Sequence, residues 1–129
     1  MKGFFIFPVL LILLFGTPAI AHFSTGVDAF NNGDYVTAMK EWKPLAEKGM
    51  VDAQFNIGWM YHYGKGVKRN YKTAVKWYQL AAEQGHAVSQ HRLALMYQNG
   101  IGITRDYKAA VKFYKKASNQ GYTKAHYNL

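Results

Sequence analysis

Apolar residues recur at helical spacing in the stretch that begins at Tyr71. They follow the i, i+3, i+4, i+7 pattern of one helix face: Tyr71, Ala74, Val75, Tyr78, Ala81 and Ala82. Polar side chains occupy the opposite face: Lys72, Lys76, Gln79 and Glu83. Gly85 predicts the end of this helix, because glycine favours the left-handed C-terminal cap. A second helix is predicted from about Ala87 to Gln98, with inward positions at Gln90, Leu93, Met96 and Tyr97.

The same pattern occurs three times along the chain. Three segments align without a gap on Tyr35, Tyr71 and Tyr107, which are 36 residues apart. Each segment also repeats an alanine, a lysine and a glycine at fixed offsets from its tyrosine. A fixed period of this length predicts an all-α solenoid of antiparallel helix pairs. We expect repeat units at about 34–69, 70–105 and 106–129, the last one incomplete.

Two glycine pairs, Gly64/Gly66 and Gly100/Gly102, also recur at this period. Glycine-rich loops can bind phosphate, but neither pair has the spacing of a dinucleotide-binding or P-loop motif, and no strand is predicted before them. Glycine supplies the positive φ angles of tight turns. We therefore interpret both pairs as turns between helices.

The N-terminus has the pattern of an export signal. Met1-Lys2 gives a positive start, an apolar run follows from Gly3 to Phe15, and Ala19-Ile20-Ala21 matches a signal-peptidase site. We expect residues 1–21 to be a signal peptide cleaved between Ala21 and His22, which makes the protein periplasmic or secreted in a bacterium. Membrane contact is then limited to the signal peptide before cleavage. The alternative is an uncleaved N-terminal anchor.

Composition narrows the class of protein. Half of the 129 residues are hydrophobic, enough for one domain with a modest core, and there is no cysteine. The absence of cysteine excludes disulfides, a lipoprotein anchor and thiolate metal sites. The net charge is +9, which favours acidic partners such as proteins or anionic envelope components.

The motifs "IGWMYHYGKGV" and "YKTAVKWYQLAAEQGHA" resemble those of Sel1-like repeat proteins, relatives of the tetratricopeptide repeats. The resemblance extends from about Ala29 to Leu129. It implies a right-handed α-solenoid that acts as a non-catalytic scaffold and binds another protein on its inner surface. By this resemblance, the setting would be bacterial envelope biogenesis, signalling or host interaction.

Two departures from the family pattern leave alternatives open. Some exported relatives carry a cysteine pair in each repeat and act on β-lactams or cell-wall material, which makes a hydrolase the alternative function. The last unit stops at "KAHYNL", where the family pattern continues, and Leu129 aligns with the inward Ile57 and Leu93. This end indicates either a truncated gene or a solenoid completed by a partner chain.

No residues are arranged for catalysis, a metal or a cofactor. The five histidines form no His-x-x-x-His pair, and the acidic residues are scattered. Ser24, Ser89 and Ser118 have no neighbouring histidine and aspartate that suggest a catalytic triad. We therefore predict that the protein is not an enzyme and needs no cofactor.

The predicted partner-binding residues lie on the helix faces opposite the inward positions. They are Phe55, Asn56, Trp59, His62, His91, Arg92, Leu95 and Gln98. Aromatic and arginine side chains are the usual anchors of an interface. The alternative is that some of them, Trp59 and Leu95 in particular, pack against the neighbouring repeat.

Lysines form a second candidate surface. They recur at i, i+4 spacing on the polar helix faces: Lys72, Lys76, Lys108, Lys112 and Lys116. Like charges at this spacing destabilise a helix by about 0.2–0.5 kcal/mol per pair. They are interpreted either as an ordinary solvated face or as a weak basic surface for an anionic envelope component, with no specific nucleic acid predicted.

Overall fold

The computed structural model describes residues 17–122 of the chain. These residues form six α-helices and no strand: α2 (Pro18–Asn31), α3 (Tyr35–Glu47), α4 (Val51–Tyr63), α5 (Tyr71–Glu83), α6 (Ala87–Asn99) and α7 (Tyr107–Asn119). The apolar run Gly3–Phe15 and the end of the incomplete last unit, residues 123–129, lie outside the described residues. The predicted cleavage site, Ala21–His22, lies inside α2.

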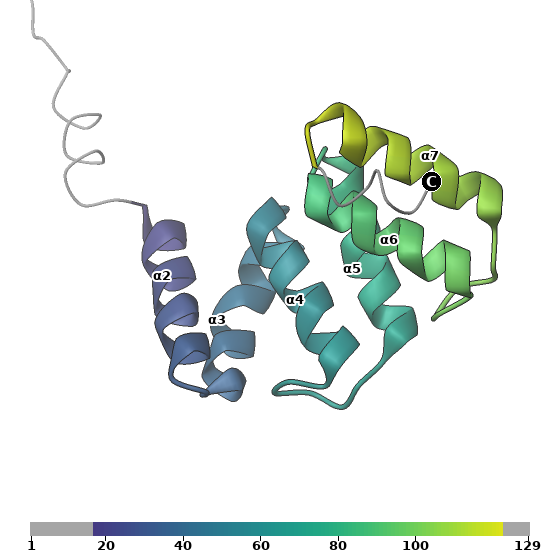
Figure 1. The fold of residues 1–129 in the computed structure, drawn as a ribbon. Helices are drawn as coiled ribbons and strands as arrows, with labels where there is room; N and C mark the ends of the chain where they lie inside the picture. The colour runs from purple at the N-terminus through teal and green to yellow at the C-terminus, as the bar shows by residue number, and fades with distance from the viewer. Residues whose placement is uncertain (1–16, 123–129) are drawn as a thin grey trace, which may run out of the picture.

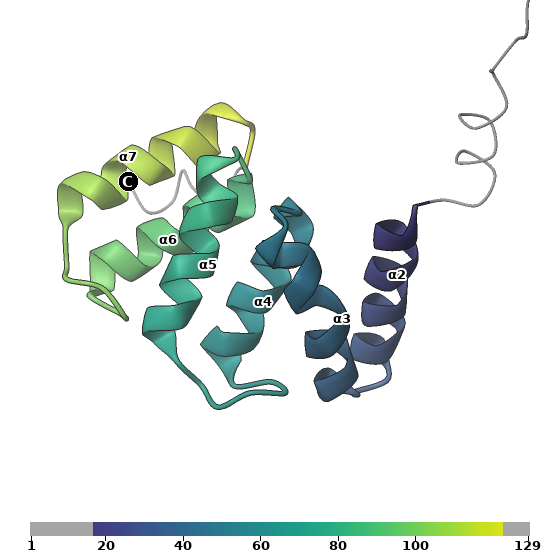
Figure 2. The ribbon, with the colours of Figure 1, turned by 180° about the vertical axis from the view of Figure 1, so that it is seen from behind.

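Successive helices lie side by side in chain order, with α2 at one end of the array and α7 at the other (Figure 1, Figure 2). Each helix packs mainly on the one before it and the one after it. Short connections reverse the chain between them, as in other helical solenoids. The predicted all-α solenoid of antiparallel helix pairs is therefore confirmed.

The helices α3, α5 and α7 begin at the same position of the repeat. Asp34, Asn70 and Asp106 are 36 residues apart, and the side chain of each accepts a hydrogen bond from the backbone N–H three residues later, at 3.0–3.1 Å. Such N-caps satisfy one of the free N–H groups at a helix start. The capping residue thus fixes where each of these helices begins.

The Gly-x-Gly turns end α4 and α6, as predicted. Gly64 and Gly100 take the left-handed conformation, with φ of 64° and 63°. Two residues later the backbone passes so close to the start of α3 that a Cβ on Gly66 would lie 2.6 Å from the carbonyl oxygen of Tyr35. Gly102 approaches Tyr71 at the start of α5 in the same way. These glycines therefore allow each turn to pack on the helix two positions before the one that follows the turn.

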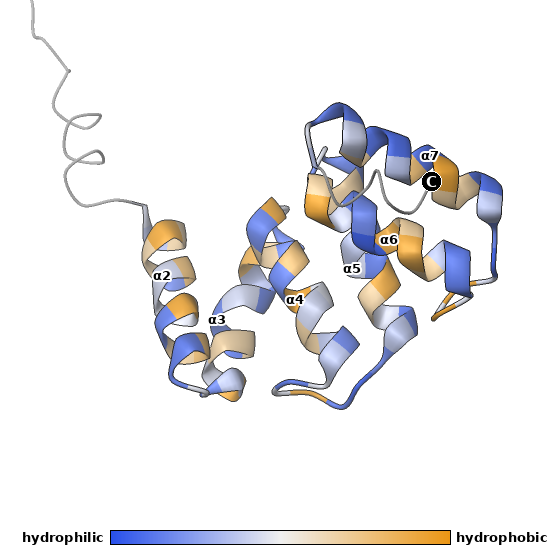
Figure 3. Ribbon diagram, in the orientation of Figure 1, coloured by the Kyte–Doolittle hydropathy of each residue, from blue (hydrophilic) through white to orange (hydrophobic). Residues whose placement is uncertain are grey.

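The core lies between the helices and uses small residues to bring them together. Tyr78 and Tyr114, which occupy the same repeat position, are buried at 0% and 1% exposure. Gly58 packs on the ring of Tyr78, where a Cβ would lie 2.8 Å from a ring carbon. Each helix shows both apolar and polar segments in Figure 3, as expected of elements buried on one side.

Tyr71 and Tyr107 occupy the same position of the repeat but differ in how much of the side chain is exposed. Tyr71 is half-buried beneath the Gly102 turn, whereas Tyr107 is 61% exposed because no described turn lies over it. Tyr107 therefore does not pack between the described helices, although it aligns with Tyr71.

Hydrogen bonds between a buried and an exposed glutamine connect each helix pair to the next helix. Gln84 donates to the side-chain carbonyl of Gln54 at 2.9 Å, and Gln120 donates to Gln90 at the same distance. Gln54 and Gln90 in turn donate to the backbone carbonyls of Ala46 and Ala82 at 3.1 Å. Because a buried amide is costly without partners, this repeated network fixes the register of the stack.

Candidate functional site

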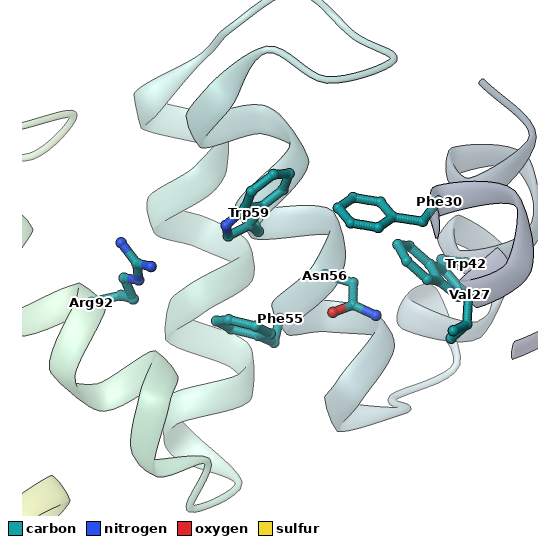
Figure 4. Close-up of a pocket in the computed structure, with 7 residues that line it drawn as sticks. All are labelled: Val27, Phe30, Trp42, Phe55, Asn56, Trp59 and Arg92. Atoms are coloured by element: carbon teal, nitrogen blue, oxygen red, sulfur yellow. The ribbon is translucent and has the colours of Figure 1, made fainter. Parts of the chain in front are cut away.

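A partly open pocket lies on one face of the solenoid, with a cavity volume of about 340 Å³. Seven residues line it: Val27, Phe30, Trp42, Phe55, Asn56, Trp59 and Arg92. All except Trp42 come from the alternate helices α2, α4 and α6. Figure 4 shows the three α4 side chains between Phe30 and Trp42 on one side and Arg92 on the other.

Aromatic rings form a continuous series along this pocket. Phe30 lies between Trp42 and Trp59, with ring centroids 5.6 Å and 5.3 Å away, and Trp59 continues to Tyr63 at 4.7 Å. The series joins α2, α3 and α4. Aromatic pairs at these separations are mutually attractive, so the rings hold one another in place and leave one rigid apolar wall.

The position of Trp42 depends on Gly26 in α2. Gly26 is buried, and a Cβ at this position would overlap the Trp42 ring. The indole Nε1–H donates to the carbonyl of Phe23 at 3.1 Å. Trp42 is thus held against α2 with only 3% of its surface exposed, and it closes the end of the pocket.

Arg92 provides the positive charge of the pocket. Its guanidinium donates to the hydroxyl of Tyr63 at 2.8 Å and lies 5.8 Å from the centre of that ring. The ion pairs among residues 17–122 are His22–Glu41 and His86–Asp52, so no described carboxylate neutralises Arg92.

Asn56 provides the neutral polar group of the pocket. Its amide makes no hydrogen bond with another described residue and is half-exposed. One acceptor and two donor hydrogens are therefore available to a ligand.

His62 lies beside the pocket and packs on α5. Its ring contacts Tyr63, Tyr71 and Tyr78, at centroid distances of 4.6–6.0 Å. Burial lowers the pKa of His62 below the ordinary 6.5, and the positive charges of Arg92 and Arg69 lower it further. The field of Arg92 therefore extends beyond its own contact with Tyr63.

Six of the eight predicted partner-binding residues divide into two groups. Phe55, Asn56, Trp59 and Arg92 meet at the pocket. Leu95 and Gln98 lie toward α7: Leu95 packs on the cluster around Tyr114, and Gln98 accepts a hydrogen bond of 2.6 Å from the Tyr114 hydroxyl.

His91 is a correction to the prediction. It is only 7% exposed and packs against Tyr114 and Tyr122, at centroid distances of 5.5 Å and 5.2 Å. Its position on α6 faces α7 rather than solvent, so it contributes to helix packing and is not accessible to a partner.

Three pocket residues were missed from the sequence: Val27, Phe30 and Trp42. Trp42 occupies the repeat position of Tyr78 and Tyr114, which marks it only as a core ring. Val27 and Phe30 belong to α2, which precedes the aligned repeats and joins α3 through a shorter connection. The spacing of repeats therefore offers no signal for them.

An Asp–His–Ser arrangement lies at the start of α6, contrary to the expectation for Ser89. His86 Nδ1 is 2.8 Å from Ser89 Oγ, and Nε2 is 3.9 Å from Asp52 Oδ1. However, Nδ1 also accepts the backbone N–H of Ser89 at 3.2 Å, and Ser89 is 0% exposed. A nucleophile must reach its substrate, so this arrangement serves as an N-cap of α6.

The lysines predicted as a basic surface are all exposed on α5 and α7. Lys112 and Lys116 lie over the ring of Phe113, with Nζ 5.8 Å and 5.5 Å from its centroid. None of the predicted lysines belongs to an ion pair of the described residues.

In the part of the chain that the structure describes, neither a cluster of metal-ligating side chains nor a membrane-spanning helix is present. No three histidine or acidic side chains there lie close enough together to hold a metal ion. None of the helices in residues 17–122 combines the length and apolarity needed to cross a bilayer.

Comparison with known proteins decides the family. The Sel1 repeat model matches residues 51–86 and 87–122, two consecutive units with the 36-residue period of the tyrosines. The chain belongs to the Sel1 repeat family. The matched units pair α4 with α5 and α6 with α7, so they begin about half a unit away from the boundaries expected from the tyrosines. Those expected boundaries remain a prediction. A sequence comparison with curated proteins finds no significant match.

Solved structures support the assignment. A Sel1 repeat protein from Oxalobacter formigenes is 33% identical with a TM-score of 0.80, and the alignment covers 87% of each chain. A protective antigen of uropathogenic Escherichia coli strains, which displays an SLR fold, is 39% identical with a TM-score of 0.80 over 83% of this chain. The chain spans only 24% of that antigen.

A third structure shares the fold alone. Cysteine-rich protein B of Helicobacter pylori has a TM-score of 0.67 at 20% identity, with 88% of this chain and 98% of that chain covered. Sel1 repeat proteins generally act as protein-interaction scaffolds.

Proposed function

We propose that this chain is a non-catalytic scaffold that binds a segment of another protein in the pocket between α2, α4 and α6. The observation that carries the proposal is the pocket itself, in which a fixed aromatic wall faces the amide of Asn56 and the guanidinium of Arg92. Buried aromatic and arginine anchors supply most of the binding energy of protein interfaces. Binding of a protein segment also agrees with the general role of Sel1 repeat proteins as interaction scaffolds.

The alternative of a cell-wall or β-lactam hydrolase has less support. The described residues offer a capping histidine and a buried serine where a hydrolase needs an accessible nucleophile. The likeness to the cysteine-rich Helicobacter protein, at 20% identity, concerns the fold alone. Turnover of a chromogenic β-lactam that is lost on Ser89→Ala would support the hydrolase instead.

In this proposal, the scaffold is exported to the bacterial periplasm or secreted from the cell. It rests on the charged start, apolar run and Ala19-Ile20-Ala21 site of the N-terminus. N-terminal sequencing of the protein from the envelope fraction tests it. A mature chain that starts at His22 supports export with cleavage, and a chain that starts at Met1 in the membrane fraction supports an anchor.

The basic surface on α5 and α7 supports a weaker, second function, attraction of an anionic envelope component. The supporting observation is that its five lysines are exposed and unpaired with carboxylates. Binding to anionic vesicles should weaken steeply with salt if phosphates are neutralised. An affinity for the vesicles that does not change with salt concentration would contradict this second function.

Site-specific photocrosslinking in the cell tests the scaffold proposal. A photoreactive amino acid is placed at Asn56 in the pocket, and at Lys76 on α5 as a matched control on the other face. We expect discrete protein adducts from position 56 that disappear when Trp59→Ala is added, and none of these from position 76. Adducts that are equal from both positions, or that ignore Trp59→Ala, would contradict the proposal.

A further inference from the structure

We infer that the pocket selects an acidic segment, in which a bulky apolar side chain and an aspartate or glutamate are separated by about three residues. The inference rests on the proposed function and adds the chemistry of the partner. It commits to an internal extended segment, with the apolar side chain against Trp59 and the acidic side chain on Arg92.

The only charge in the lining of the pocket is positive. Arg92 is the single ionised residue among the seven that line it. Its hydrogen bond goes to the neutral hydroxyl of Tyr63, so its charge is oriented but not neutralised. A carboxylate can reach a guanidinium in a two-pronged geometry, and such charge-assisted bonds are stronger than neutral ones. A carboxylate is therefore the complementary group at this end.

The other end of the pocket is apolar and rigid. Phe30 contacts both Trp42 and Trp59, and Phe55 adds a ring that packs on Tyr78 at 5.9 Å. A cavity of about 340 Å³ lies at the lower limit of ligand pockets, which typically run from about 300 to 1,000 Å³. It therefore has room for one large apolar side chain rather than for a folded partner surface.

Asn56 lies among the aromatic side chains, on the same helix as Phe55 and Trp59 and on the side of them away from Arg92 (Figure 4). Its unpaired amide can accept from the N–H and donate to the C=O of one peptide group, which holds an extended backbone across the pocket. This pairing favours a segment whose backbone continues past the apolar side chain on the side away from Arg92.

The spacing in the motif follows from the positions of Trp59 and Arg92 on either side of Tyr63. The ring centre of Trp59 lies 4.7 Å from that of Tyr63, and the guanidinium of Arg92 lies 5.8 Å from the same centre, so Trp59 and the guanidinium are at most about 10.5 Å apart. An extended chain advances about 3.3 Å per residue. The apolar and acidic side chains should therefore be separated by about three residues.

The test is a selection of random twelve-residue peptides displayed on phage, with the full chain as bait. Peptides that bind the wild type should share a bulky apolar residue with Asp or Glu about three residues away from it, in either direction. With R92Q as bait the acidic residue should disappear from the selected set while the apolar one remains, and with R92E it should be replaced by Lys or Arg. Circular dichroism checks that each variant keeps its helices.

Synthetic versions of a selected peptide measure the effect and its source. Replacement of its acidic residue by the matching amide should weaken binding to the wild type by about tenfold or more and leave binding to R92Q nearly unchanged. Amidation of the peptide's C-terminus should have no effect. If amidation abolishes binding, the carboxylate comes from a chain end and the inference is wrong.

The outcomes separate this inference from the proposed function. Peptides that need Trp59 but contain no acidic residue would refute the inference and leave the binding pocket standing. Peptides whose binding is insensitive to both Trp59→Ala and R92Q would refute both.

Discussion

The guanidinium of Arg92 on α6 donates a 2.8 Å hydrogen bond to the hydroxyl of Tyr63 on α4. The two residues belong to successive repeats, and Tyr63 also continues the aromatic series through Trp59. This one contact therefore connects the charge of the pocket to its apolar wall. It orients Arg92 without neutralising it.

Tyr63→Phe should remove the hydrogen bond and keep the ring. Because both residues are partly exposed, we expect the free energy of unfolding to fall by at most about 1 kcal/mol. Urea denaturation measures this change. Tyr63→Ala, which also removes the ring contact with Trp59, should destabilise more. A larger loss in Tyr63→Phe than in Tyr63→Ala would show that the bond has been misjudged.

Gly26→Ala should displace α2 from Trp42. The added methyl group would overlap the indole ring, and overpacking of this kind typically costs about 1–3 kcal/mol. Urea denaturation gives the loss, and amide hydrogen exchange should show faster exchange in α2. Ser24→Ala, an exposed position on the same helix, is the control and should change stability little. Equal behaviour of the two variants would mean that α2 is not held through Gly26.

Gln90→Ala should weaken the stack, because Gln90 bonds to both the Ala82 carbonyl and the Gln120 side chain. Loss of a buried hydrogen-bonding group leaves its partners unsatisfied and costs about 1–3 kcal/mol. Thermal and urea unfolding measure the change. Gln79→Ala, whose 3.4 Å bond to Glu83 lies on the exposed side of α5, is the matched control. A cost as small as that of the control would show that the buried network contributes no stability.

The folded protein should lose stability as the pH falls from neutral. Burial lowers the pKa of both His62 and His86 below 6.5, with Arg92 and Arg69 adding to the effect on His62 and Asp52 opposing it on His86. As the pH falls, the unfolded chain therefore binds protons at these histidines before the folded protein does. The stability that comes from their neutral forms is fully present above about pH 6.5, and it is lost as the pH falls toward their pKa values in the folded state. Urea unfolding should require less denaturant at about pH 5.5 than at about pH 7.5.

A variant that combines His62→Gln with His86→Asn isolates these two groups. Asparagine keeps an acceptor at the start of α6, since it is itself a favoured N-cap. We expect the pH dependence over this range to flatten in the variant. A slope that is unchanged from the wild type would place the titrating groups elsewhere.

The sequence was sufficient for the fold because the fold repeats. The 36-residue spacing of Tyr35, Tyr71 and Tyr107 places helices, turns and core rings without any long-range information. The same spacing aligns the exposed Tyr107 with the half-buried Tyr71, because an alignment does not show whether another turn covers a ring. It also gave no sign that His86 and Ser89 would meet at a helix cap near Asp52.

Only about half of the residues of the candidate site could be predicted from the sequence. Helical periodicity puts Phe55, Asn56 and Trp59 on one face of α4, but it cannot distinguish a groove from a helix interface. His91 shows the difference: the next helix covers it. Phe30 enters the pocket because α2 packs closely on α3 through Gly26, a contact between segments that periodicity does not describe.

The central claim is that the pocket holds a partner segment through Trp59 and Arg92. The most direct test is the affinity of a crosslinked or selected segment for the wild type and for the Trp59→Ala, Arg92→Ala double variant, by isothermal titration calorimetry with circular dichroism on the same samples. The account predicts binding weaker by about a hundredfold or more at nearly unchanged helicity. Unchanged affinity, or loss of helicity in the variant, would contradict it.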